Sequence, residues 1–317
     1  MADQSGRYKK TDSRVTDNTA GRNILNKNTT ETKKPETLQD LQDEKLKKAV
    51  IEELRRREKR RKRLITLCLL LALGSLGYFC AYSYMTYQTE AISNRLSYEK
   101  DKTGSADETS DGLAIHKDGK ENAPAILPEY RDLYNQNQSL VGWIKIDGTN
   151  INYPVVQAQN NEYYLTHNFD QDYDKNGSVF LDSSCDVINR STNLIVYGHH
   201  MKSGAMFGQL DFYADHDFYE KHKTFAFDSI YDRGIYEVVY VFRSQVYTKE
   251  EITFKYYQFI NANSKAEFDS DMLSMAKMSL YDTGITPVYG NQLVTLSTCD
   301  HTKTQEGRFV VVGIKIS

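Results

Sequence analysis

The sequence predicts a mainly β domain, a barrel or a sandwich, that follows a single membrane-spanning helix. From about residue 125 onward, short apolar runs rich in β-branched and aromatic residues recur at modest spacing, separated by turn sequences. Long helical patterns are scarce in this part, which is typical of a β fold. Ahead of it, residues 64–85 contain no charge over 22 positions, and a helix needs about 20 residues to cross a bilayer.

The charges around the apolar segment predict its orientation. Residues 1–63 carry 19 Lys and Arg against 11 Asp and Glu, although the whole chain has a net charge of −3. The run RRREKRRKR, residues 55–63, directly precedes the segment, while the far flank has only Glu90 before Arg95. This bias places the N-terminus in the cytoplasm and the C-terminal bulk outside. A cleaved signal peptide has an apolar core of about 7–15 residues and a small-x-small site, so we expect a retained anchor.

Composition divides the chain into four parts. Residues 1–37 are polar and aperiodic, and we expect them to be disordered. Residues 38–63 have leucines near helical spacing among many charges, which predicts a basic helix on anionic lipid, with a partner helix or coiled coil as the alternative. The expected parts are a cytoplasmic region (1–63), a transmembrane signal anchor (64–85), a charged extracytoplasmic spacer (86–124) and a folded domain (125–317).

Within the folded domain, each element has its own signal. LPEYRDLYNQN predicts a helix, and LVGWIKIDGTNINYPVVQ alternates apolar and polar residues around a DGTN turn, which predicts a hairpin. A late helix is expected from Ser264 to Tyr281, and its methionines are expected to pack in the core. Further strands are expected in GSVFLD, NLIVYGHH, YEVVYVFRSQVY, QLVTLSTC and RFVVVGIKI.

Only two cysteines lie outside the apolar segment, Cys185 and Cys299. A disulfide between them is one interpretation in an extracytoplasmic compartment. The alternative concerns Cys299, which ends an apolar strand and belongs to no CxxC pair. Such a cysteine is a candidate nucleophile if a histidine can reach it.

One histidine has a matching position. His199 ends the apolar run NLIVYG, so its strand delivers it to a sheet rim just as LVTLST delivers Cys299. Gly198 before it permits a bend or a close approach of the backbone. His200 is the alternative, and spacing does not decide between the two. The other extracytoplasmic histidines lie among charges and are expected to be solvated: His116, His167, His216, His222 and His301.

Arg308 lies across a short polar loop from Cys299. If the two flanking strands pair as a hairpin, both residues lie at the same end of the sheet. A guanidinium cannot act as a base, but it donates several hydrogen bonds in a fixed fork and can stabilise a thiolate or an oxyanion. The alternative is a surface ion pair with Asp300 or Glu306, worth under about 1 kcal/mol.

Other chemistries find no support in the sequence. Adjacent histidines in GHH point to opposite faces of a strand, and no HExxH, CxxC or carboxylate cluster accompanies them, so we expect no metal. No GxxxxGK[ST] or GxGxxG motif appears, and we expect no cofactor. The acidic C-terminal part argues against nucleic acid as a ligand.

Four segments together resemble one enzyme family. TLSTC, the arginine nine residues later and YGHHMKSGAMFGQL resemble the sortases, which are membrane-anchored cysteine transpeptidases of Gram-positive bacteria. LVGWIKIDGTNINYPVVQ, with YYLTHNF and GSVFLD, resembles the class B branch. The resemblance covers residues 127–317, and it implies an eight-stranded β-barrel with an N-terminal helix and an inserted late helix. Residues 125–317 would then be the catalytic domain. The region before the span is longer than the family pattern, and Cys185 matches no family motif, so we expect it to be free and buried.

The resemblance also implies roles. Cys299 would be the nucleophile, His199 the general acid and base, Arg308 the stabiliser of the oxyanion, and Ser297 a secondary candidate for substrate contact. The implied reaction cleaves a C-terminal sorting signal of secreted proteins through a thioester and transfers them to an amine of a peptidoglycan precursor, lipid II. Two alternatives remain: a pilin-polymerising sortase with a lysine acceptor, and a non-catalytic membrane-tethered binding domain.

Overall fold

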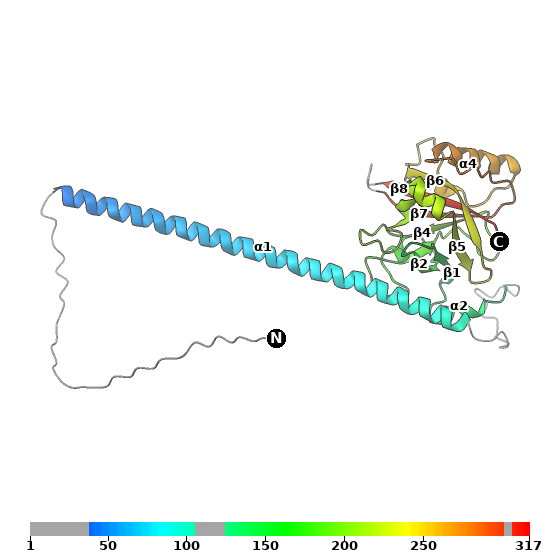
Figure 1. The fold of residues 1–317 in the computed structure, drawn as a ribbon, viewed down its shortest axis with the longest axis horizontal. Coiled ribbons are helices and arrows are strands. Elements are labelled where there is room, and N and C mark those ends of the chain that lie inside the picture. Colours follow the sequence, from blue (N-terminus) through cyan, green and yellow to red (C-terminus); the bar gives the residue numbers. More distant parts are fainter. Residues whose placement is uncertain (1–37, 105–123, 301–305) are drawn as a thin grey trace, which may run out of the picture. The chain divides into compact units, whose positions relative to one another are not determined.

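The computed structural model describes residues 38–104, 124–300 and 306–317 (Figure 1). The chain divides into two compact units, Met1–Leu73 and Gly74–Ser317. Helix α1 (Leu38–Gly104) contributes to both, and every strand that the structure describes lies in the second unit. The expected disorder of residues 1–37 falls outside the described residues, as do residues 105–123 of the expected spacer.

Eight strands close into a barrel in the order β1-β2-β3-β4-β7-β8-β6-β5. The predicted mainly β fold, its barrel form and its two helical additions are therefore confirmed. The strands are β1 (Leu140–Lys145), β2 (Asn152–Val156), β3 (Val179–Leu181), β4 (Asn193–Tyr197), β5 (Thr224–Ser229), β6 (Ile235–Gln245), β7 (Leu293–Cys299) and β8 (Gly307–Lys315).

Two antiparallel hairpins and one parallel strand pair determine where the ends of the candidate strands lie. β1 and β2 form the predicted hairpin, and Gly148 at its turn has a φ of +76°, a conformation that favours glycine. β7 and β8 form the second predicted hairpin. β4 and β7 instead run parallel, and they pair residues one hundred positions apart in register, from Asn193 with Leu293 to Tyr197 with Ser297. This parallel pair brings the ends of two distant segments to one rim.

Helices cover the barrel at separate places. α2 (Pro128–Gln136) begins the domain with Pro128 at its first turn, a favoured position. The predicted late helix is α4 (Lys265–Met278), which begins after Ser264, whose hydroxyl accepts a hydrogen bond from the backbone N–H of Glu267 (3.2 Å). Its buried face, Phe268, Met272 and Met275, packs in the core as expected. Shorter helices are η2 (Tyr163–Leu165), η3 (Leu210–Ala214), α3 (His216–Lys221) and η4 (Tyr256–Gln258).

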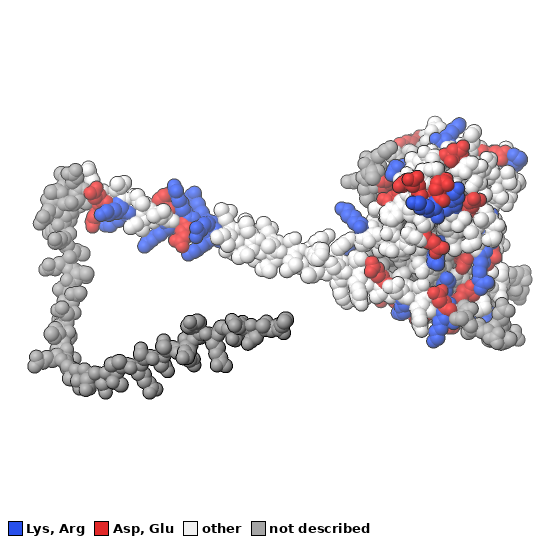
Figure 2. Space-filling model, in the orientation of Figure 1, with Lys and Arg blue, Asp and Glu red and all other residues white. Residues whose placement is uncertain are grey.

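Helix α1 is long and apolar enough to cross a membrane by length and composition. Figure 2 shows Lys and Arg side chains gathered on it directly before a white stretch without charges. These are the basic run of residues 55–63 and the apolar segment that follows. Residues 38–63 are therefore helical, as expected.

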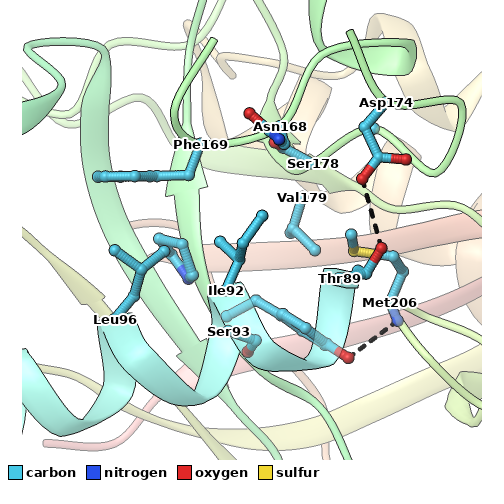
Figure 3. A pocket seen from close by; sticks show the side chains of 13 residues that line it. Thr89, Ile92, Ser93, Leu96, Asn168, Phe169, Asp174, Ser178, Val179 and Met206 are labelled. Carbon is cyan, nitrogen blue, oxygen red and sulfur yellow. Dashed lines mark hydrogen bonds between the residues drawn. The ribbon is translucent and has the colours of Figure 1, made fainter. Parts of the chain in front are cut away.

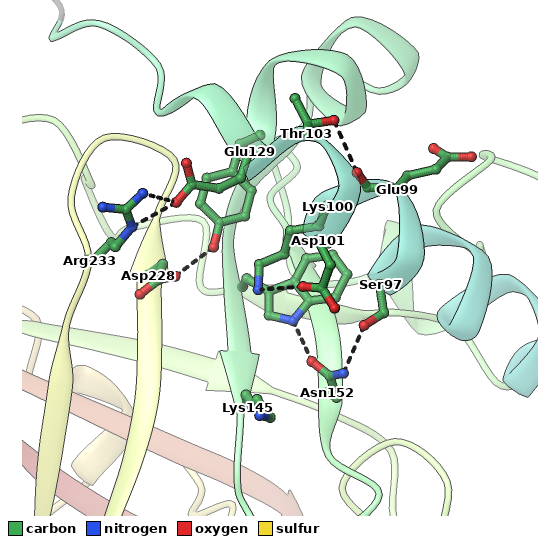
Figure 4. Close-up of polar contacts among 12 residues, drawn as sticks. Ser97, Glu99, Lys100, Asp101, Thr103, Glu129, Lys145, Asn152, Asp228 and Arg233 are labelled. Atoms are coloured by element: carbon green, nitrogen blue, oxygen red, sulfur yellow. Dashed lines mark hydrogen bonds and ion pairs between the residues drawn. The ribbon is translucent and has the colours of Figure 1, made fainter. Parts of the chain in front are cut away.

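Over residues 86–104 the structure differs from the expected spacer. α1 continues without a break to Gly104, and it packs on the domain through Thr89 and Leu96, which are 5% and 1% exposed. Farther along, Ser97 accepts a hydrogen bond from Asn152 Nδ2 (3.0 Å), and the oxygen of that amide accepts one from Trp143 Nε1 (2.7 Å; Figure 4). Residues 86–104 are therefore a helix with one buried face, although many of them are charged.

Candidate active site

The ends of β4 and β7 form the rim on which the candidate residues lie. Beyond the last paired residues, Gly198 N donates to Ser297 O (3.2 Å) and Thr298 Oγ1 donates to Gly198 O (2.7 Å). These bonds extend the parallel pairing by one step. His199 and Cys299 are the next residues of their segments, so the fold brings together the two candidates that the sequence separates by one hundred positions.

His199 is held from a different segment. Its Nε2 lies 2.8 Å from the carbonyl oxygen of Leu165, the last residue of η2. Because a carbonyl oxygen can only accept, this contact assigns a proton to Nε2. Gly198 makes the close approach expected of it, since a Cβ there would lie 2.7 Å from the ring of Phe207.

His200 takes a separate position. Its Nε2 lies 3.2 Å from Asp211 Oδ2, and its backbone forms an isolated antiparallel β-bridge with Met206. The two adjacent histidines therefore have different partners, and His199 is the one that faces the pocket described below.

Cys299 and Arg308 face each other as a cross-strand pair of the β7–β8 hairpin. Arg308 Nη1 donates to the carbonyl oxygen of Gly307 (2.8 Å), which fixes one arm of the guanidinium. The Asp300 carboxylate instead accepts from Arg243 Nε (2.8 Å), a residue on β6. Among the described residues, Arg308 forms no ion pair with Asp300 or with Glu306, so the alternative of a surface ion pair has no support.

A pocket of about 540 Å³ opens at this rim. It is lined by all four candidate residues, His199, Ser297, Cys299 and Arg308, together with Asn161, Glu162, Leu165, Phe180, Tyr197, Gly198, Val246, Tyr256, Tyr257 and Thr298. A thiol, an imidazole and a guanidinium thus share one cavity. Such a set can supply a nucleophile, a proton carrier and a stabiliser of negative charge, the requirements of acyl transfer.

The pocket includes a buried pair of hydroxyls. Tyr256 Oη and Ser297 Oγ lie 2.7 Å apart, and each residue is 1% exposed. Burial raises the pKa of Tyr256 to about 12, although the hydrogen bond with Ser297 and the charge of Arg308 oppose this shift. The phenol is therefore neutral at physiological pH, and the Ser297 hydroxyl is occupied within the protein.

Cys185 lies apart from this pocket. It is a free, buried cysteine, as expected, and Cys299 is free as well, so no disulfide joins them. Burial raises the pKa of the Cys185 thiol to about 12. Because the thiolate is the nucleophilic form, this cysteine is unreactive at neutral pH.

Three further residues of the pocket, Leu165, Tyr256 and Asn161, have no signal in the sequence. Leu165 contributes a backbone carbonyl, which leaves no mark on residue type. Tyr256 comes from a single turn of 3-10 helix between β6 and α4, a region without a periodic pattern. Asn161 enters from the loop between β2 and β3. Among the residues that the structure describes, no cluster of three or more His, Cys, Asp or Glu side chains could hold a metal ion.

Comparison with known proteins matches this architecture to one family. A family model described as "Sortase domain" matches residues 144–316. Sortase B of Staphylococcus aureus is 31% identical over 192 residues, which covers 60% of this chain and 75% of that protein. Sortase B of Listeria monocytogenes is 34% identical over 189 residues, covering 59% of this chain and 74% of that protein.

Solved structures agree with the sequence matches. Sortase B from Bacillus anthracis superposes with a TM-score of 0.60 at 30% identity, covering 74% of this chain and 99% of that one. A Staphylococcus aureus sortase B–substrate complex gives a TM-score of 0.54 at 28% identity, covering 61% and 86%. With its closed eight-stranded barrel and these relatives, the chain belongs to the sortases, cysteine transpeptidases, in their class B branch.

Proposed function

We propose that Cys299, His199 and Arg308 perform the transpeptidation, and that its first substrate is a C-terminal sorting signal of a secreted protein. The observation that carries this proposal is the shared pocket at the ends of β4 and β7. In the first step, the Cys299 thiolate attacks the carbonyl carbon of the penultimate motif residue, usually threonine. Arg308 donates hydrogen bonds to the oxyanion of the tetrahedral intermediate.

Collapse of that intermediate breaks the C–N bond. His199 gives a proton to the departing amine, and a thioester between the substrate and Cys299 remains. In the second step, an amine of a peptidoglycan precursor attacks the thioester carbon while His199 takes the amine proton. The C–S bond breaks, a new amide bond joins the protein to the precursor, and the thiolate is regenerated.

The location of these steps follows from the anchor. We propose that residues 64–85 span the cell membrane with residues 1–63 in the cytoplasm, because the basic run lies before the apolar segment. The barrel then works outside the membrane, where secreted proteins and lipid-linked wall precursors meet. The proposed result is covalent anchoring of proteins to the cell wall.

Mass spectrometry of the intact protein tests the chemistry. The full chain is incubated with peptides carrying LPxTG-type or NPxTN-type motifs, first without an amine and then with a short glycine peptide. We expect a mass increase equal to the N-terminal peptide fragment, which maps to Cys299 and disappears when the amine is added. A lysine-bearing pilin-like acceptor in place of the glycine peptide tests whether the enzyme polymerises pilins.

The controls use the two cysteines that lie outside the apolar segment, Cys185 and Cys299. Cys299→Ala should form no adduct, whereas Cys185→Ser should form it at the wild-type rate because that thiol is buried outside the pocket. An adduct that persists in Cys299→Ala would exclude Cys299 as the nucleophile. A wild-type chain that forms no adduct with any of these peptides would reject the proposed substrate class.

A further inference from the structure

We propose that the membrane-proximal part of α1 is a positioning element for the active site, which acts on His199 through the loop between β2 and β3. This inference rests on the proposed function, because it assumes that His199 carries the proton.

The loop holds His199 through one backbone atom. The bond between Leu165 O and His199 Nε2 (2.8 Å) orients the imidazole and keeps a proton on Nε2. In the neutral ring, Nδ1 is then the nitrogen free to exchange a proton with the substrate amine. Any displacement of the Leu165 carbonyl therefore changes both the direction of the ring and its tautomer.

The carbonyls next to Leu165 are fixed by one short turn. Tyr164 O accepts from Ser178 N (2.9 Å), and Thr166 O accepts from Asp174 N (2.9 Å). Gly177 lies in the same turn with a φ of +59°, and a Cβ there would be 2.7 Å from Leu165 O. The turn 174–178 therefore determines where the Leu165 carbonyl lies.

Helix α1 contacts that turn with a buried hydroxyl. Thr89 Oγ1 accepts from Asn176 Nδ2 (2.9 Å). The same hydroxyl lies 3.3 Å from Asp174 Oδ2, a contact drawn as a dashed line in Figure 3. Thr89 and Asn176 are 5% and 2% exposed, so water cannot replace this contact without rearrangement. The Asp174 carboxylate also accepts from the N–H of Asn176 (2.8 Å), so both side chains that meet Thr89 belong to the turn itself.

Apolar and ionic contacts support the same loop. Leu96 and Ile92 of α1 pack in one cluster with Tyr164 and Phe169 of the loop. Arg95 Nη2 donates to both oxygens of Asp170, at 2.8 and 3.0 Å. Thr89 lies only four residues after the end of the predicted span. The first helical turn after the span therefore contacts the loop that orients His199.

The test compares two hydroxyls of the same helix in the full-length protein. Thr89→Val keeps the side-chain volume and removes the hydroxyl that contacts the turn. Ser97→Ala removes a hydroxyl that contacts Asn152 on β2 and does not touch the loop. Thr89→Ser keeps the contact and serves as the rescue. The measurements are kcat and KM for a sorting-signal peptide, and the ¹⁵N signals that report the His199 tautomer.

We expect Thr89→Val to lower kcat about 10-fold with little change in KM, because the proton carrier is misplaced while the rest of the pocket is intact. The fraction of His199 protonated on Nε2 should fall as well. Thr89→Ser and Ser97→Ala should both keep the wild-type kcat and tautomer. Equal losses in Thr89→Val and Ser97→Ala would mean that α1 contributes only stability, and the proposal would be wrong.

Two further outcomes are distinguishable. A wild-type tautomer and kcat in Thr89→Val would overturn the positioning role while leaving the proposed function in place. If the wild-type chain cleaves no sorting-signal peptide, the proposed function fails, but the comparison of His199 tautomers still decides whether Thr89 positions the ring.

Discussion

The buried hydroxyl pair of the pocket gives a prediction whose magnitude follows from the structure. Tyr256→Phe removes one hydroxyl and keeps the ring, and Ser297 Oγ then loses the partner 2.7 Å away. Since Ser297 is 1% exposed, solvent does not replace that partner without rearrangement. A buried polar group left unpaired costs about 1–3 kcal/mol, so the free energy of unfolding should fall by that amount.

A double-mutant cycle separates this pair from simple packing. Ser297→Ala alone leaves the Tyr256 hydroxyl unpaired and should also cost about 1–3 kcal/mol, whereas the double variant leaves no unpaired group. We therefore expect the double variant to lose about 1–2 kcal/mol less than the sum of the single losses. Denaturant unfolding of the purified protein measures all four free energies.

The control for this cycle is a tyrosine in solvent. Tyr173 is 75% exposed, and Tyr173→Phe should change the free energy of unfolding by less than about 0.5 kcal/mol. Strictly additive losses for Tyr256→Phe and Ser297→Ala would show that the two hydroxyls do not stabilise each other, and their hydrogen bond would have no role in stability.

Three further predictions concern the site and the core. Arg308→Lys keeps the charge but loses the fork of donors, so kcat for a sorting-signal peptide should fall about 100-fold; an unchanged kcat would make Arg308 structural. Gly177→Ala places a Cβ against Leu165 O and should lower both kcat and thermal stability, whereas Gly284→Ala, at similar φ but in open space, should affect only stability. Burial raises the pKa of the Cys185 thiol from 9.0 to about 12, so the folded state holds this proton more tightly than the unfolded state does, and the free energy of unfolding should fall as the pH rises from 9 to 12. In unfolding measured as a function of pH, Cys185→Ser should show a smaller decline than the wild type. An equal decline in the two proteins would exclude this thiol as the cause.

Some elements were predictable because their signal is local. β7 and β8 are continuous β-branched runs on either side of a short loop, so their pairing and the meeting of Cys299 with Arg308 followed from the sequence. The late helix was visible in the spacing of Phe268, Met272 and Met275. In contrast, β5 (Thr224–Ser229) was missed, because its six residues alternate within a polar stretch.

The extent of α1 was misjudged for a related reason. Residues 86–104 carry enough charge to suggest a spacer, yet Thr89, Ile92 and Leu96 lie on one helical face. Only packing against Tyr164 and Phe169 shows that this face is buried. The composition of a segment is an average over all faces of a helix, so it does not reveal one narrow apolar face.

By itself, the sequence determined the β class, the apolar segment, and the strand ends that carry Cys299 and His199, since each is encoded within about ten neighbouring residues. Only the tertiary structure decided that β4 and β7 run parallel in register, that Leu165 binds His199 rather than His200, and that Tyr256 shares the pocket. Those facts depend on contacts between segments distant in the chain and on backbone atoms. Such contacts are set by closure of the whole barrel, and no local pattern of residue types records them.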